Sequence, residues 1–122
     1  MTAYDDILAE RDRQDAKWGE QNHPDGTGPN TLPLMDTWIH IPEDDMRGLE
    51  DYTARLLAFA ATQATNAAAR GHRSEPVTWR DILLEEVTEA FAEEDLDRLR
   101  TELIQVAAVA AQWAEAIDRR RT

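Results

Sequence analysis

Apolar residues recur every three to four positions along most of the chain, which is the spacing of one face of an α-helix. This pattern predicts four helices, over residues 2–17, 46–70, 79–93 and 96–120. No stretch alternates apolar and polar residues for long enough to predict a β-sheet. We therefore expect an all-α fold, a four-helix bundle formed by a single domain over residues 1–122.

Residues at the expected helix ends agree with these limits. Gly19 and Gly71 follow the first and second helices, where glycine commonly ends a helix. Thr78 and Asp81 have the spacing of a capping box at the start of the third helix. The connection 93–95 between the last two helices is so short that it predicts an antiparallel hairpin.

A long irregular loop is expected after the first helix, over residues 19–45. It holds four of the five prolines, and proline removes a backbone donor that helices and sheets need. Asp44 or Asp45 is the expected N-cap of the helix that follows. Loops of this length in compact domains are often functional or mobile.

The apolar stripes also predict which side chains face inward. On the first two helices these are Tyr4, Ile7, Leu8 and Arg11, and then Leu49, Tyr52, Leu56, Phe59, Ala60 and Gln63. On the last two they are Trp79, Ile82, Leu83, Val87, Ala90 and Phe91, and then Leu99, Leu103, Val106, Val109, Ala110, Trp113 and Ile117. We expect three of the four tryptophans in the core or in an interface: Trp38, Trp79 and Trp113.

Composition and charge narrow the function classes. The chain is 42% hydrophobic and 31% charged, as in folded soluble proteins, and its formal net charge of −12 argues against nucleic-acid binding. No apolar run reaches the ~20 residues of a membrane helix, and the N-terminus lacks the features of a signal peptide. We expect a cytoplasmic protein that does not associate with a membrane. The absence of cysteine excludes disulfides and thiolate chemistry.

Acidic residues on the expected hairpin give the main functional signal. Glu86 and Glu89 lie three positions apart, as do Glu102 and Gln105, so each pair shares a helix face. Antiparallel packing would gather both pairs into one oxygen-rich cluster. Carboxylates crowded beside an apolar seam repel one another and call for a cation, and Mg²⁺ prefers oxygen ligands. Spacing alone leaves a second interpretation equally open, a Glu-rich face in contact with solvent.

These motifs resemble those of the MazG-like branch of the all-α nucleoside triphosphate pyrophosphohydrolases. That pattern is E-E-x-x-E followed by E-x-x-D at a similar gap; here twelve residues separate Glu89 from Glu102. The segment 85–89 (Glu-Glu-Val-Thr-Glu) matches the first motif, and 102–105 (Glu-Leu-Ile-Gln) matches the second except at its last position. The resemblance covers residues 79–118 well and extends more loosely to residues 13–24.

The resemblance implies a MazG-like bundle that hydrolyses a nucleoside triphosphate (NTP or dNTP) to the monophosphate and pyrophosphate. Glu86, Glu89 and Glu102 would be the catalytic metal ligands for Mg²⁺, or for Mn²⁺ in its place. Gln105 would complete the ligand set through its amide oxygen. Glu85 would be either a base behind the ligands or an outward-facing neighbour, and we prefer the second. The resemblance also implies a homodimer or homotetramer.

Gln105 is the departure from the pattern that matters, because an amide brings no charge and cannot act as a base. It could instead hydrogen-bond Glu102 or a neighbouring helix. The alternative function is therefore a catalytically weak or inactive MazG-like module that binds a nucleotide or a protein partner.

Substrate contacts are expected near the end of the first helix. Trp18 could stack on a base, while Lys17 and Arg13 could meet phosphates; a core position that caps the bundle is an equal alternative for Trp18. Three further arginines are weaker candidates: Arg11, Arg55 and Arg70. The histidines His23, His40 and His72 lack the His-x-x-x-His spacing of a zinc site, although the loop could bring His23 to the site.

Overall fold

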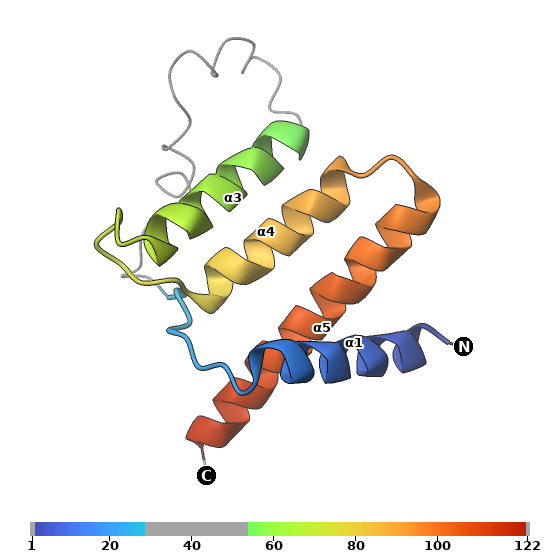
Figure 1. Ribbon diagram of the computed structural model, residues 1–122, viewed down its shortest axis with the longest axis horizontal. Coiled ribbons are helices and arrows are strands. Elements are labelled where there is room, and N and C mark those ends of the chain that lie inside the picture. The colour runs from blue at the N-terminus through green and yellow to red at the C-terminus, as the bar shows by residue number, and fades with distance from the viewer. Residues whose placement is uncertain (1, 29–53, 122) are drawn as a thin grey trace.

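The computed structural model describes residues 2–28 and 54–121, and within these ranges the chain forms four α-helices and no strand (Figure 1). The helices are α1 (Ala3–Trp18), α3 (Ala54–Ala69), α4 (Trp79–Ala92) and α5 (Leu96–Arg120). The expected all-α bundle is confirmed. No helix among the described residues is both long enough and apolar enough to cross a membrane.

Some predictions fall outside the described residues. These are the loop beyond residue 28, the cap at Asp44 or Asp45, the first part of the second helix, and the placements of Trp38, His40, Leu49 and Tyr52. The side chains of Arg55 and Leu56 also lie outside the description, although their backbone belongs to α3.

Each of the described helices packs against at least one other. α3 packs against α4, α4 forms the expected antiparallel hairpin with α5, and α1 crosses α5 (Figure 1). The junction of α1, α4 and α5 therefore combines the N-terminal helix with both acidic motifs.

Local hydrogen bonds set the helix starts. Thr2 and Asp5 form a capping box at α1, and Thr78 and Asp81 form the predicted one at α4. Asp81 also accepts from Arg73 at 2.5 Å, and both side chains are buried. Burial alone would raise the pKa of Asp81, but hydrogen bonds from Arg73 and Thr78 outweigh it and lower that pKa. The start of α4, which carries the first acidic motif, is thereby fixed.

Gly71 ends α3 as predicted. Its φ is +73°, its N–H donates to Ala68 O at 3.2 Å, and the N–H of His72 donates to Ala67 O at 2.8 Å. This pair of bonds is the Schellman motif, which favours glycine at the left-handed position.

Among the described residues, the core is built mainly from small side chains around the large ring of Trp79. Trp79 is 1% exposed; its ring lies 6.5 Å from that of Trp113 in a stacked arrangement and 4.9 Å from the edge-on ring of His23. The core placement of Trp79 is confirmed, whereas Trp113 stacks on it and is half-buried. The rest of the core consists of Ala60, Ala61, Ala64 and Ala68 of α3, Ala90 of α4, and Ile104, Ala108, Val109 and Ala116 of α5.

The segment 19–28 holds the start of α4 against the end of α5. Pro24 O and Asp25 O accept from the backbone N–H groups of Trp79 and Arg80, at 2.9 and 3.1 Å. The indole N–H of Trp113 donates to Asp25 Oδ1 at 2.8 Å. The segment supplies acceptors for donors that the first turn of a helix leaves unpaired.

Several inward placements are wrong. Tyr4 (80% exposed) and Leu8 (65%) face away from the bundle, as do Phe91 (70%) and Leu103 (50%), and Phe59 and Ala110 are also exposed. Arg11 is buried as expected. The contacts run instead through small or polar residues such as Ala90, Ala108 and Gln112, because these let the helices approach closely.

Candidate metal centre

The two acidic motifs meet where α4 and α5 face each other. Glu86 and Glu89 come from α4 and Glu102 from α5, and one carboxylate oxygen of each lies within 4.8 Å of the others. All three residues are half-buried. The clustering that the three-residue spacing predicted is thus confirmed.

The cluster carries an excess of negative charge in a partly desolvated place. Burial, reinforced by the charges of Glu89 and Glu102, raises the pKa of Glu86 to about 7. Burial is also the main reason that the pKa values of Glu89 and Glu102 are raised. Each carboxylate would be stabilised in its charged form by a cation placed among them.

The donor set fits a small divalent cation. Mg²⁺ binds oxygen at about 2.1 Å, so two ligands on opposite sides of it are at most about 4.2 Å apart. The observed limit of 4.8 Å between oxygens is close to that span, and small side-chain rotations would close the difference. Three carboxylates also suit the preference of Mg²⁺ and Mn²⁺ for hard oxygen ligands.

Gln105 lies between two of these carboxylates. The amide forms hydrogen bonds with both carboxylates when its nitrogen points toward them. The nitrogen then donates to Glu86 Oε2 at 3.1 Å and to Glu102 Oε2 at 3.2 Å. The opposite orientation would place the amide oxygen against acceptors alone. This arrangement matches the alternative in which Gln105 hydrogen-bonds Glu102 and a neighbouring helix. The amide oxygen then points away from the glutamates.

Glu85 does not face outward as expected. It is half-buried toward α3, where the hydroxyl of Thr62 donates to Glu85 Oε1 at 3.4 Å. Burial raises the pKa of Glu85, and hydrogen bonds from Thr65 and Thr62 oppose the rise. The preference for an outward position is wrong because α3 packs against that side of α4.

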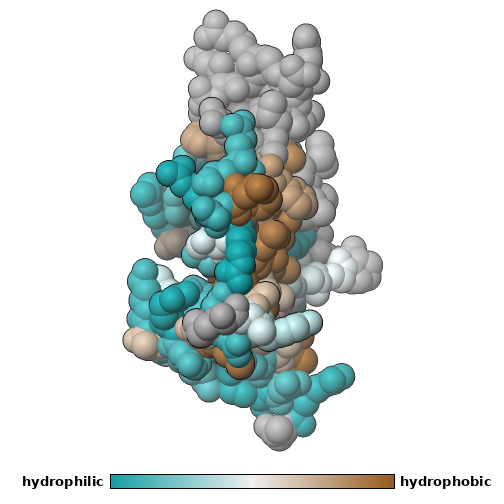
Figure 2. Space-filling view, turned by 90° about the vertical axis from the view of Figure 1, so that its right-hand side faces the viewer, coloured by the Kyte–Doolittle hydropathy of each residue, from teal (hydrophilic) through white to brown (hydrophobic). Residues whose placement is uncertain are grey.

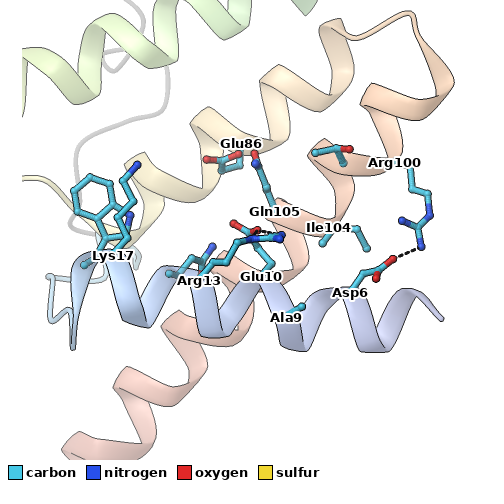
Figure 3. Close-up of a pocket in the computed structure, with 12 residues that line it drawn as sticks. Asp6, Ala9, Glu10, Arg13, Lys17, Glu86, Arg100, Ile104 and Gln105 are labelled. Atoms are coloured by element: carbon cyan, nitrogen blue, oxygen red, sulfur yellow. Dashed lines mark hydrogen bonds and ion pairs between the residues drawn. The ribbon is translucent and has the colours of Figure 1, made fainter. Parts of the chain in front are cut away.

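A cleft of about 660 Å³ opens beside the cluster, between α1 and the α4–α5 pair. Glu86 and Gln105 line it from one side, and Lys17, Trp18 and Arg13 line it from α1. Figure 3 shows Glu86 and Gln105 pointing toward each other across from Glu10 and Arg13. Five of the predicted site residues therefore share one cavity, whereas Glu89 and Glu102 do not line it.

The cationic groups of the cleft already have partners. Arg13 Nε donates to Glu10 Oε2 at 2.8 Å, and at the opposite end Arg100 pairs with Asp6 at 2.7 Å (Figure 3). Lys17 Nζ lies 4.7 Å from the ring centroid of Trp18. An anionic ligand would therefore exchange intramolecular ion pairs for contacts with its own oxygens.

Trp18 is 59% exposed, so its alternative placement as a core residue is wrong. Its indole ring lines the cleft next to Lys17. An exposed indole that borders a polar cavity offers a flat apolar surface to a ligand.

Five polar residues of this cleft were not predicted from the sequence. They are Asp6, Glu10, Gln14, Arg100 and Thr101. Positions 6, 10, 13 and 17 follow the spacing of one helix face, so a polar stripe on the first helix was readable in the sequence. Arg100 had no such signal, because its place depends on how α1 crosses α5.

The remaining candidates lie in other surroundings. Arg11 is 7% exposed and bonds Glu115, Asp15 and Gln14. His23 packs on Trp79, and burial lowers its pKa. His72 and Arg70 are exposed and do not line the cleft.

In comparisons with known proteins, no family model matches the chain, and neither a curated protein sequence nor a solved structure matches it.

Proposed function

We propose that this protein is a Mg²⁺-dependent nucleoside triphosphate pyrophosphohydrolase that resembles the MazG-like enzymes. One observation carries the proposal: a cluster of three glutamates borders a cleft whose opposite wall holds a lysine, an arginine and an exposed tryptophan. These are the groups needed to hold a cation, to bind phosphates and to stack on a base.

The cleft has the size and chemistry of a small-molecule site. Its volume of about 660 Å³ falls within the range of about 300–1,000 Å³ typical of ligand pockets. Arg13 and Lys17 would bind phosphate oxygens, and Trp18 would stack on the base. Glu86 is the carboxylate of the cluster that lines this cleft, so the phosphates would lie toward the α4–α5 side.

Glu86, Glu89 and Glu102 would hold the cation. When bound, Mg²⁺ would supply neutralisation of phosphate charge and a lower pKa for a bound water. In the proposed reaction water adds to the α- or β-phosphorus, and the bond from that phosphorus to the oxygen bridging the two phosphates breaks. The water loses a proton, and the products are the nucleoside monophosphate and pyrophosphate. Arg13 and Lys17 would offset the charge that develops on the phosphate oxygens.

The test is pyrophosphate release from a panel of canonical and modified nucleotides, with Mg²⁺ or Mn²⁺. We expect Glu86→Gln and Glu89→Gln to lower the rate at least about 100-fold, because each removes a charged ligand. Glu94→Gln, an exposed glutamate in the α4–α5 connection, is the matched control and should retain the wild-type rate.

Metal binding without turnover of any nucleotide would contradict the hydrolase and favour the alternative, an inactive MazG-like nucleotide-binding or protein-interaction module. In that case Gln105→Asp, which restores the acidic residue of the motif, tests whether position 105 alone silences the site. Recovered pyrophosphate release would assign the loss to Gln105.

A homodimer or homotetramer forms the last part of the proposal. Hydrophobic residues form a band beside hydrophilic ones on the face of the molecule shown in Figure 2. Phe59, Phe91 and Leu103 are large apolar residues at least 42% exposed, and association would bury such side chains. A monomer mass in light scattering at micromolar concentration would contradict it.

A further inference from the structure

Gln105 sits where the resembling motif has an acidic residue, and its surroundings define what its side chain does. An amide NH₂ group has two protons, and two carboxylate oxygens lie within hydrogen-bond distance of it, Glu86 Oε2 at 3.1 Å and Glu102 Oε2 at 3.2 Å. One proton is available for each carboxylate. The amide therefore bridges α4 and α5 at the centre of the cluster.

We propose that Gln105 is a clamp that orients Glu86 and Glu102, and that it is not itself a ligand of the cation. The inference rests on the metal site of the proposed function and assigns the role of one residue within it. Gln105 is thus a positioning residue, because it acts on the cation only through the two glutamates.

The two hydrogen bonds involve only one oxygen of each carboxylate. Gln105 takes Oε2 of Glu86 and Oε2 of Glu102, so the Oε1 atom of each remains available to a cation. A carboxylate that is hydrogen-bonded through one oxygen and binds metal through the other is held in orientation by that bond.

Coordination by Gln105 would require a different arrangement. The amide would have to turn by about 180°, give up both hydrogen bonds to charged acceptors, and direct its oxygen toward Glu86 and Glu102. The clamp avoids this rearrangement, since the same two hydrogen bonds serve the site with and without the cation.

NMR of the ¹⁵N,¹³C-labelled full chain tests the clamp through the chemical shifts of the Gln105 side-chain amide. The amide signals are assigned by their loss in Gln105→Met, or in Gln105→Glu should the methionine variant fold poorly. In metal-free protein at pH 8, where both carboxylates are ionised, we expect N–H protons shifted downfield from those of an exposed glutamine, as charged acceptors produce. Signals at the position of a solvated amide would overturn the clamp.

Titration with Mg²⁺ alone separates the two roles. If Gln105 is a clamp, its N–H protons stay downfield and its Cδ chemical shift hardly changes as the cation binds. Return of the N–H protons to solvated positions together with a shift of Cδ would show a coordinating oxygen and overturn the inference.

Affinity gives a second readout with a matched control. Gln112 lies seven residues along the same helix and is buried, so Gln112→Met makes the same substitution away from the cluster. Loss of a partner that orients ligands typically costs about 10-fold or more in metal affinity. We expect this loss for Gln105→Met and not for Gln112→Met; equal affinities for both would contradict the clamp.

The outcomes for the clamp and for the proposed function are distinguishable. Absence of pyrophosphate release would contradict the hydrolase without moving the amide signals. If Mg²⁺ shifts no resonance of the cluster, the metal site is contradicted, while the metal-free spectrum still establishes or overturns the two hydrogen bonds.

Discussion

Arg11 and Glu115 join α1 to α5 through a pair of hydrogen bonds. Arg11 Nη2 donates to Glu115 Oε2 at 2.5 Å and Nε donates to Oε1 at 3.4 Å, with Arg11 only 7% exposed. Because α1 carries the residues expected to bind substrate, this contact holds one wall of the cleft in place.

We therefore predict that Arg11→Met lowers the free energy of unfolding by about 1–2 kcal/mol, a figure reduced because Glu115 is half-exposed and solvent screens the pair. Urea denaturation measures it. Arg98→Met, at an exposed position of α5, should change stability by less than about 0.5 kcal/mol. Equal stability of the two variants would show that Arg11 does not anchor α1.

Gly26 is expected to tolerate no side chain. Its φ is +76°, and an added Cβ would lie 2.6 Å from Oγ1 of Thr78, the residue that caps α4. Gly26→Ala should cost about 2–4 kcal/mol, combining the left-handed backbone with displacement of the cap. Gly19→Ala is the matched control, since φ there is +67° and a Cβ would meet no described atom within 4 Å. Thermal unfolding should show a clearly smaller loss for Gly19→Ala.

Stability should fall as the pH rises from 5 to 8 in the presence of a chelator. The pKa of Glu86 is about 7 in the folded protein against 4.5 as its ordinary value, so between these pH values the folded state binds more protons than the unfolded state. By linkage, the contribution of Glu86 to stability is full below pH 4.5 and is lost as the pH passes 7, by roughly 2–3 kcal/mol. The raised pKa values of Glu89 and Glu102 act in the same direction.

The melting temperature measured at several pH values tests this, with Glu86→Gln as the comparison. The variant should show a flatter decline, because the neutral amide has no charge to desolvate. Mg²⁺ should raise the melting temperature more at pH 8 than at pH 5, since it binds ionised carboxylates. A wild-type melting temperature that rises with pH under chelation would contradict this account of the cluster.

The sequence predicted the helices more accurately than their faces. Caps such as Thr78 with Asp81 and the glycine after α3 are local signals, so α4 and α5 begin where expected. Which side of a helix is buried depends on its partners. Small side chains such as Ala90 and Ala108 let α4 and α5 pack closely, and Phe91 and Leu103 are consequently left exposed.

The candidate site likewise has parts that were predictable from the sequence and parts that were not. The glutamate cluster follows from three-residue spacing and a short turn, and it was predictable. The direction of Glu85 was not, because it depends on where α3 packs, and neither was the cleft, because α1 is far from α4 in sequence. The orientation of the Gln105 amide follows only from the two carboxylates that face it.

Trp18→Ala should weaken nucleotide binding without weakening the fold. The indole is 59% exposed and lines the cleft, and stacking on a base is worth about 1–3 kcal/mol. We expect KM to rise about 10-fold, with the melting temperature unchanged. Tyr4→Ala removes another exposed aromatic residue from α1 that does not line the cleft. Equal kinetics in the two variants would remove Trp18 from the substrate site.

The central claim is that Glu86, Glu89 and Glu102 bind a divalent cation. Calorimetric titration with Mg²⁺ at pH 8 tests it most directly, comparing the wild-type protein with Glu86→Ala, Glu89→Ala and the exposed control Glu94→Ala. Saturable binding in the wild type and the control, with affinity at least about 10-fold weaker in both cluster variants, is the predicted result. Indistinguishable heats in all four proteins would contradict the claim.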